Sequence, residues 1–137
     1  MAESGVPRDY DVMLRECCND VCNELGGGLT EAIYRNALAL ALRLDGYQVS
    51  MEVVIPVEFQ GEVVGSLRAD LIVDKIRVIE LKVAAKITDA HVQQLEAYLM
   101  RMPADATGHV VNFGNADFEI RAPGPSGEEP KKRKRAR

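Results

Sequence analysis

The feature that most constrains the fold is a long stretch of strand-forming sequence in the middle of the chain. Over residues 47–59 apolar side chains occupy every second position, at Val49, Met51, Val53, Ile55, Val57 and Phe59. This two-residue period is typical of a strand with one buried face. Pro56 has no backbone N–H, which predicts that this strand lies at a sheet edge or contains a bulge.

The remaining elements follow from apolar spacing and from turn residues. Further strands are expected at 63–73, 76–83 and 109–113, and a turn at 60–62 joins the first two. Helices are expected at 11–25, 29–44 and 89–102, where apolar residues recur three and four positions apart. The glycine run 26–28 ends the first helix. The order ααβββαβ predicts an α/β fold with a mixed sheet flanked by helices.

Length and composition fit one globular domain. The chain has 137 residues, of which 47% are apolar, and this suffices for a core without disulfides or metals. No apolar run approaches the roughly 18 residues of a membrane span, so no membrane partner is expected. Residues 1–9 are expected to be a flexible N-terminus, 10–120 a single domain, and 121–137 a disordered linker and basic tail.

The net charge of −4 conceals two opposite regions. Residues 1–120 carry 10 basic and 19 acidic side chains, whereas the last seven residues carry six basic ones. The basic run is Lys131, Lys132, Arg133, Lys134 and Arg135. It resembles a monopartite nuclear localisation signal, and it is also a candidate nucleic-acid contact. We therefore expect the nucleus of a eukaryotic cell or host, and otherwise the cytoplasm.

Three cysteines, Cys17, Cys18 and Cys22, lie close together in the first predicted helix. Their odd number, in a chain without an export signal, favours free thiols. A zinc site would need His91 or His109 as a fourth ligand, and that spacing matches no common zinc pattern. We expect partly packed thiols on a helix.

The chemically informative residues lie on two consecutive predicted strands. Glu80 and Lys82 are two positions apart, so they share one face. Asp70 joins them only in one register: a two-residue loop at 74–75 places it opposite Ile79, and a three-residue loop at 74–76 places it opposite Glu80. The second register also gathers the apolar residues Ala69, Leu71, Val73, Ile79 and Leu81 on the other face, and we prefer it for that reason.

Two carboxylates on one sheet face repel each other unless a cation lies between them. Hard oxygen ligands of this kind suit Mg²⁺ or Mn²⁺, which can polarise a phosphodiester and acidify a bound water. Lys82 can orient that water or stabilise developing negative charge. The plain structural alternative is a surface salt bridge between Glu80 and Lys82.

Asp70 followed by Glu80-Leu81-Lys82 resembles the D…E-x-K core of the PD-(D/E)XK nuclease superfamily. Residues 28–34 (GLTEAIY) match the G-x-x-E-x-x-Y motif of the GxxExxY family within it. Residues 94–98 (QLEAY) fit its Q-x-x-x-Y element, and residues 111–114 (VNFG) are similar to its closing strand. The resemblance covers about 10–120. One departure is that Ala69, not proline, precedes Asp70.

The resemblance implies a restriction-endonuclease-like fold and a Mg²⁺-dependent nuclease that hydrolyses DNA. It implies that Asp70 and Glu80 hold the metal with Glu31 as an additional acidic group, and that Lys82 assists the attacking water. Gln94 and Tyr98 share a helix face, where they contact phosphate or steady Lys82. The alternative for this pair is that Tyr98 packs in the core and Gln94 bonds to backbone. Arg68 lies on the Asp70 face as a candidate phosphate contact, and Tyr34 is expected to be structural.

Two classes of function remain in competition. The first is the metal-dependent nuclease, with DNA as its main partner. The second is a non-catalytic module that keeps the fold and binds nucleic acid or protein, for example in a virion or on chromatin. The strongly acidic body favours the second, because it is a poor electrostatic footprint for DNA. Candidate partners also include a nuclear import receptor at the tail and a second copy of the chain.

Overall fold

The computed structural model describes residues 9–114 and 117–123, and all structural statements below concern these residues. The elements follow one another as α1 (Tyr10–Leu25), α2 (Glu31–Leu44), β1 (Val49–Phe59), β2 (Glu62–Val73), β3 (Arg77–Lys82), α3 (Asp89–Leu99), β4 (Thr107–Asn112) and β5 (Glu119–Arg121). Each predicted helix and strand is present, with ends shifted by three residues or fewer. No helix in these two ranges is both long and apolar enough to cross a bilayer.

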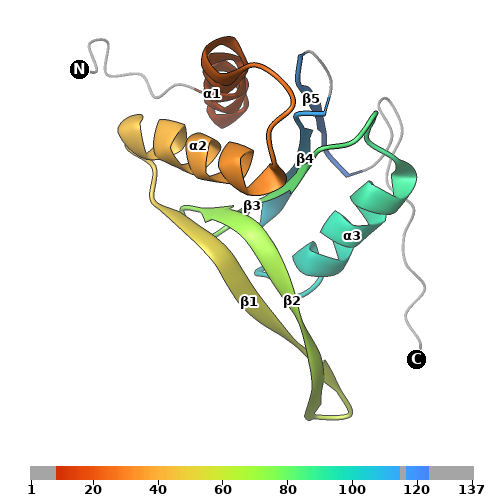
Figure 1. Cartoon of the computed structure of the whole chain (residues 1–137). Coiled ribbons are helices and arrows are strands. Elements are labelled where there is room, and N and C mark those ends of the chain that lie inside the picture. The colour runs from red at the N-terminus through yellow and green to blue at the C-terminus, as the bar shows by residue number, and fades with distance from the viewer. Residues whose placement is uncertain (1–8, 115–116, 124–137) are drawn as a thin grey trace.

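The strands form one mixed sheet in the order β1-β2-β3-β4-β5. β3 and β4 are parallel, and α3 is the crossover between them; the other neighbours are antiparallel. α1 and α2 cover one face, where Leu71, Ile79 and Val111 are buried. α3 covers the other face, where Ile72, Val78 and Val110 are buried (Figure 1). The sheet lies between two helical layers, which confirms the predicted α/β class.

The helices begin and end where local chemistry predicts. Gly26 closes α1 with a φ of 71°, and its N–H donates to the carbonyl of Cys22 over 2.9 Å. Thr88 caps α3: its hydroxyl accepts the N–H of His91, and the His91 ring in return accepts the N–H of Thr88. His91 is therefore a capping residue. In α1 the three cysteines are free, as predicted; Cys17 and Cys18 are buried, and Cys22 is half-buried.

β1 and β2 form a long hairpin whose far end extends away from the helices (Figure 1). β1 is an edge strand, and its register with β2 shifts between Val57 and Glu58, directly after Pro56. The proline thus lies at an edge and beside a bulge, where its missing N–H costs no central ladder bond. A tight turn at Gln60-Gly61, both with positive φ, joins the strands.

The register between β2 and β3 has the predicted three-residue turn at 74–76. Leu71 pairs with Ile79, Ile72 with Val78, and Val73 with Arg77. The same register places Asp70 opposite Glu80. The two acidic side chains therefore meet across neighbouring strands.

One sequence prediction is wrong: Ala69 does not share a face with Leu71. Ala69 is fully buried in the cluster on the α3 side, whereas Leu71 lies in the cluster under α1 and α2. The alternation of sheet faces along β2 is interrupted between Ala69 and Leu71, and the neighbouring strand β1 is irregular at the same level. Glu52 of β1 has a φ of 55°, and regular β1–β2 pairs exist at Met51 and Val53 but not between them. This irregularity changes the sheet face to which the following side chains of both strands point, as bulges do beside functional sites.

A short strand that the sequence did not predict closes the sheet. β5 pairs with β4 and ends at Arg121, one residue past the expected domain limit. Asn112, fully buried at the end of β4, organises this corner. Its Oδ1 accepts the backbone N–H groups of Ala84 and Gly114, each over 2.9 Å. Gly114 comes so near Ala84 that a Cβ there would lie 2.0 Å from its carbonyl oxygen.

Candidate active site

Asp70 and Glu80 face each other where the β2–β3 backbone ladder ends. The backbone N–H of Asp70 donates to Glu80 Oε2 over 3.2 Å, and the backbone N–H of Leu81 donates to Asp70 Oδ2 over 2.7 Å. Each carboxyl group therefore takes the place of a ladder acceptor on the opposite strand. The strands are held together by their acidic side chains, which fixes both carboxyl groups in position.

Burial and mutual repulsion perturb this pair. Glu80 is only 3% exposed, and burial, followed by the negative charge of Asp70, raises its pKa to about 8. Burial also raises the pKa of Asp70, opposed by the Leu81 N–H bond and by the charges of Arg35 and Lys82. Burial and the neighbouring charge of Asp70 therefore favour the protonated form of Glu80 at neutral pH.

Lys82 lies beside this pair and is held by α3. Its Nζ donates to Oε1 of Gln94 over 2.9 Å, and its charge lowers the pKa of both Asp70 and Glu80. No Glu80–Lys82 ion pair is found in the described part of the chain, so the surface salt bridge considered from sequence does not form. The neutral side chain of Gln94 instead holds the Lys82 amine next to the two carboxyl groups.

Tyr98 supports the same corner from the next turn of α3. It is 4% exposed, and its hydroxyl donates to the backbone carbonyl of Arg68 over 3.0 Å. Burial, followed by the charges of Glu80 and Asp70, raises its pKa to about 12. Tyr98 therefore packs in the core and ties α3 to β2 next to the site. The side chain of Arg68 itself is exposed.

The start of α2 brings a third carboxylate towards the pair. Glu31 is the first residue of α2, and burial, followed by the charge of Asp70, raises its pKa. Tyr34 fixes this helix end: its hydroxyl donates to the Gly26 carbonyl over 2.7 Å, and its ring stacks on Phe113 at 4.9 Å. Tyr34 is thus structural, as expected, and it anchors the glycine turn that precedes α2 and Glu31.

Two charged residues that the sequence reasoning missed complete the surroundings. Arg35 lies one helical turn after Glu31, and its Nη1 forms an ion pair with Glu52 over 2.9 Å. Its charge lowers the pKa of both Glu31 and Asp70. The four-residue spacing from Glu31 was a usable signal for Arg35. Nothing in the sequence marks Glu52, because its position depends on the left-handed backbone within β1.

The donor set can be compared with what a divalent cation needs. Among the residues that the structure describes, no three His, Cys, Asp or Glu side chains lie close enough together to hold a metal. Mg²⁺, however, keeps several waters and is commonly bound through one or two protein carboxylates together with substrate phosphates. Asp70 and Glu80 supply such oxygens, and a cation beside them would offset the negative charge of Asp70 that raises the pKa of Glu80. These residues fit a Mg²⁺ or Mn²⁺ site.

The basic residues predicted as nucleic-acid contacts, Lys131 to Arg135, lie outside the described residues. Comparisons with curated proteins and with solved structures found no match. A family model described as the PD-(D/E)XK nuclease superfamily matches residues 8–122, which include every element of the fold. The chain therefore belongs to the PD-(D/E)XK nuclease superfamily.

Proposed function

We propose that this protein is a divalent-metal-dependent nuclease that hydrolyses DNA phosphodiester bonds, and that it belongs to the GxxExxY group of the superfamily. The observation that carries the proposal is the buried carboxyl pair of Asp70 and Glu80, with the Lys82 amine held beside it. Burying two acidic groups together lowers folding stability, and groups perturbed in this way are concentrated at functional sites. Members of the superfamily generally use divalent metals, which gives the pair a purpose.

Each residue then has a defined role. Asp70 and Glu80 would hold Mg²⁺ or Mn²⁺, with Glu31 as a further acidic group on the α2 side. When bound, the cation supplies Lewis acidity at a phosphate oxygen and lowers the pKa of a water. Lys82 stabilises negative charge that develops during attack, and Gln94 orients the amine through its carbonyl oxygen. Glu80 would have to be ionised in order to hold the cation.

The basic run 131–135 is proposed as a second contact for DNA or as a nuclear address. Residues 1–120 carry a large excess of acidic side chains, so the domain alone has little electrostatic attraction for a polyanion. A basic segment compensates for this deficit by releasing counterions from DNA. This proposal predicts that DNA affinity falls steeply with salt and that neutralising 131–135 removes most of that dependence.

The second candidate function is a binding module that keeps the fold without catalysis. It is favoured by the same acidic excess, which would suit a protein partner better than DNA. Under this proposal, substitutions of Asp70 and Glu80 leave binding to the natural partner unchanged.

Calorimetry with Mn²⁺ and Mg²⁺ separates the two candidates. Wild type is expected to bind with a dissociation constant between micromolar and millimolar. Asp70→Asn with Glu80→Gln is expected to lose at least about tenfold in affinity. Glu62→Gln, an exposed carboxylate at the start of β2, is the matched control and should bind as wild type. Because Glu80 must lose its proton, the heat near pH 7 should also depend on the ionisation enthalpy of the buffer.

Cleavage is then assayed with single-stranded DNA, double-stranded DNA and RNA, with and without EDTA. The proposal expects metal-dependent cleavage of DNA that Asp70→Asn reduces at least about a hundredfold. Metal binding by wild type together with no cleavage of any of these substrates would refute the nuclease and favour the binding module. Absence of metal binding in the folded wild type would refute the proposed site itself.

A further inference from the structure

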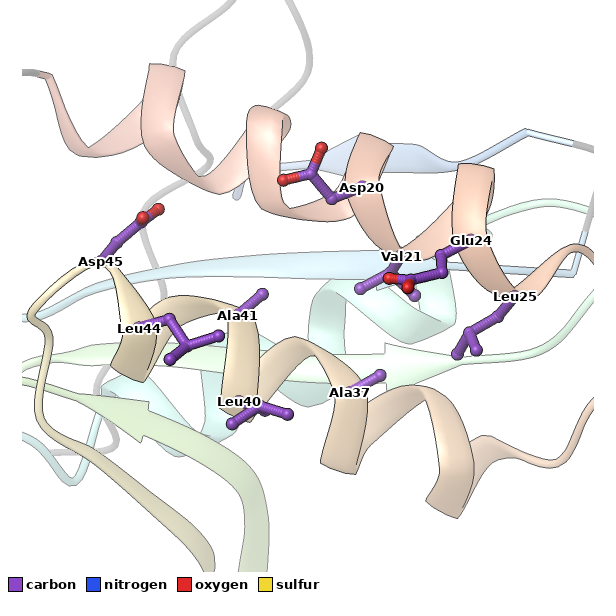
Figure 2. Close-up of a pocket in the computed structure, with 9 residues that line it drawn as sticks. All are labelled: Asp20, Val21, Glu24, Leu25, Ala37, Leu40, Ala41, Leu44 and Asp45. Carbon is purple, nitrogen blue, oxygen red and sulfur yellow. The ribbon is translucent and has the colours of Figure 1, made fainter.

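A groove lies between α1 and α2, and none of the candidate active-site residues lines it (Figure 2). We call it the α1–α2 groove. Its volume is about 470 Å³, and it is lined by Asp20, Val21, Glu24, Leu25, Ala37, Leu40, Ala41, Leu44 and Asp45. The nuclease proposal makes no use of this surface.

The shape of the groove suits a bound helix. Its lining residues form rows spaced four apart: Val21 and Leu25 on α1, Ala37 and Ala41 on α2, and Leu40 and Leu44 beyond them. Rows with this spacing are the ridges and grooves through which helices pack on one another. The two alanines leave a shallow trough, and the flanking leucines form its walls.

The leucines of this groove are unusually exposed. Leu44 is 77% exposed, Leu40 57% and Leu25 39%. Single exposed apolar residues are ordinary, but a contiguous apolar patch with a polar rim is typical of an interaction surface. Covering these side chains would remove apolar area from water and stabilise a complex.

The rim of the groove is uniformly acidic. Asp20 and Glu24 lie on successive turns of α1, and Asp45 follows the end of α2 (Figure 2). No lysine or arginine is among the lining residues. One carboxyl oxygen of Asp45 accepts the thiol hydrogen of Cys17 over 3.3 Å, which fixes that end of the rim. An occupant must therefore combine an apolar face with positive charge.

We propose that the α1–α2 groove binds a basic amphipathic helix of a partner protein, with apolar residues on the trough and Lys or Arg on the acidic rim. Charge complementarity selects this occupant. A second copy seated groove to groove would oppose three carboxylates with three more. The basic run of the chain itself, residues 131–137, offers six cations but only one alanine to fill the trough.

The proposal specifies the pattern of the bound helix. Apolar side chains should recur at i, i+4 and i+7 or i+8, so that one row lies over Ala37 and Ala41. Basic side chains should flank that row on the side that faces Asp20 and Glu24. Bound in this way, the helix adds a third member to the layer that covers one face of the sheet.

The test uses the full 137-residue chain and two synthetic helical peptides of 18 residues. Both carry leucine in the predicted pattern; one has lysine at the flanking positions and the other has glutamate there. Fluorescence anisotropy at low salt should give a dissociation constant on the order of 10 µM for the lysine peptide. The glutamate peptide should bind at least about tenfold more weakly, and added NaCl should weaken the lysine peptide.

Substitutions in the α1–α2 groove test whether the lysine peptide binds there. Leu40→Ser with Leu44→Ser, and separately Asp20→Asn with Glu24→Gln, should each reduce affinity for the lysine peptide at least about tenfold. The matched control is Val63→Ser with Val64→Ser, which removes two equally exposed apolar side chains from the hairpin of β1 and β2. That control should bind as wild type. All the substituted side chains are exposed, and the buried Val21 stays unchanged.

Four results would overturn the proposal. Equal affinity for the two peptides would remove the charge argument, and unchanged affinity of the groove variants would place binding elsewhere. A dimer in sedimentation that Leu40→Ser with Leu44→Ser dissociates would assign the groove to a second copy. Finally, tenfold tighter peptide binding after replacing the basic residues 131–135 by glutamine would assign it to the chain's own basic run.

Discussion

Replacing Glu80 by glutamine should stabilise the protein in neutral and alkaline solution. Glutamine has the shape of a protonated glutamic acid: its carbonyl can accept the Asp70 N–H, and its amide can donate to the Asp70 carboxylate. The wild-type side chain must instead lose a proton in a site where burial and Asp70 disfavour its charged form. Glu80→Gln removes that titration without removing the contacts.

The size and sign of the effect follow from the pKa in each state. Below pH 4.5 the proton is bound in both the folded and the unfolded chain, so Glu80 has little influence on stability. Between pH 4.5 and about 8 the unfolded chain releases the proton first, and the free energy of unfolding falls as pH rises. Each pKa unit corresponds to about 1.4 kcal/mol, so the rise from 4.5 to about 8 gives a total loss on the order of 5 kcal/mol.

Urea unfolding of both proteins from pH 5 to pH 9 measures this effect. We expect similar stability near pH 5 and a difference that grows to a few kcal/mol in favour of Glu80→Gln near pH 8. Millimolar Mn²⁺ at pH 8 should restore stability to wild type but not to the variant. Glu58→Gln, an exposed carboxylate on β1, controls for general charge effects. Stability curves that stay parallel over the whole pH range would refute the conclusion that burial and Asp70 raise the pKa of Glu80.

Three further substitutions test the surroundings of the site. Gly114→Ala should destabilise the fold by about 3 kcal/mol, because its Cβ would overlap a backbone carbonyl, whereas Gly65→Ala, with open space around it, should be near neutral in thermal unfolding. Tyr34→Phe should cost about 1 to 2 kcal/mol in urea unfolding, since it loses the hydroxyl bonds to the glycine turn but keeps the stacked ring; no change would contradict that role. Arg35→Gln should raise the pKa of Asp70 further in a carbon-13 NMR titration, and Arg35→Lys should restore it; equal pKa values in all three proteins would show that Arg35 does not act on the site.

Much of the site was predictable because it depends on local pattern and on a single register. The apolar alternation of residues 71–81 favours one loop length, and that loop length places Asp70 opposite Glu80. The four-residue spacing of Gln94 and Tyr98 puts both on one helix face, and both lie beside the carboxyl pair. The helix caps were equally predictable from the sequence, because a cap is a contact between near neighbours in sequence.

The sequence alone determined the element order, the helix and strand ends to within a few residues, and the register that brings two acidic side chains together. Only the tertiary structure decided which further charges surround them. Glu52 reaches Arg35 because its backbone adopts a left-handed conformation within β1, and the same irregularity turns Ala69 to the opposite face from Leu71. β5, three residues long, exists only because β4 offers it an edge. These features depend on packing between segments distant in sequence, whereas periodicity reports only what each segment prefers by itself.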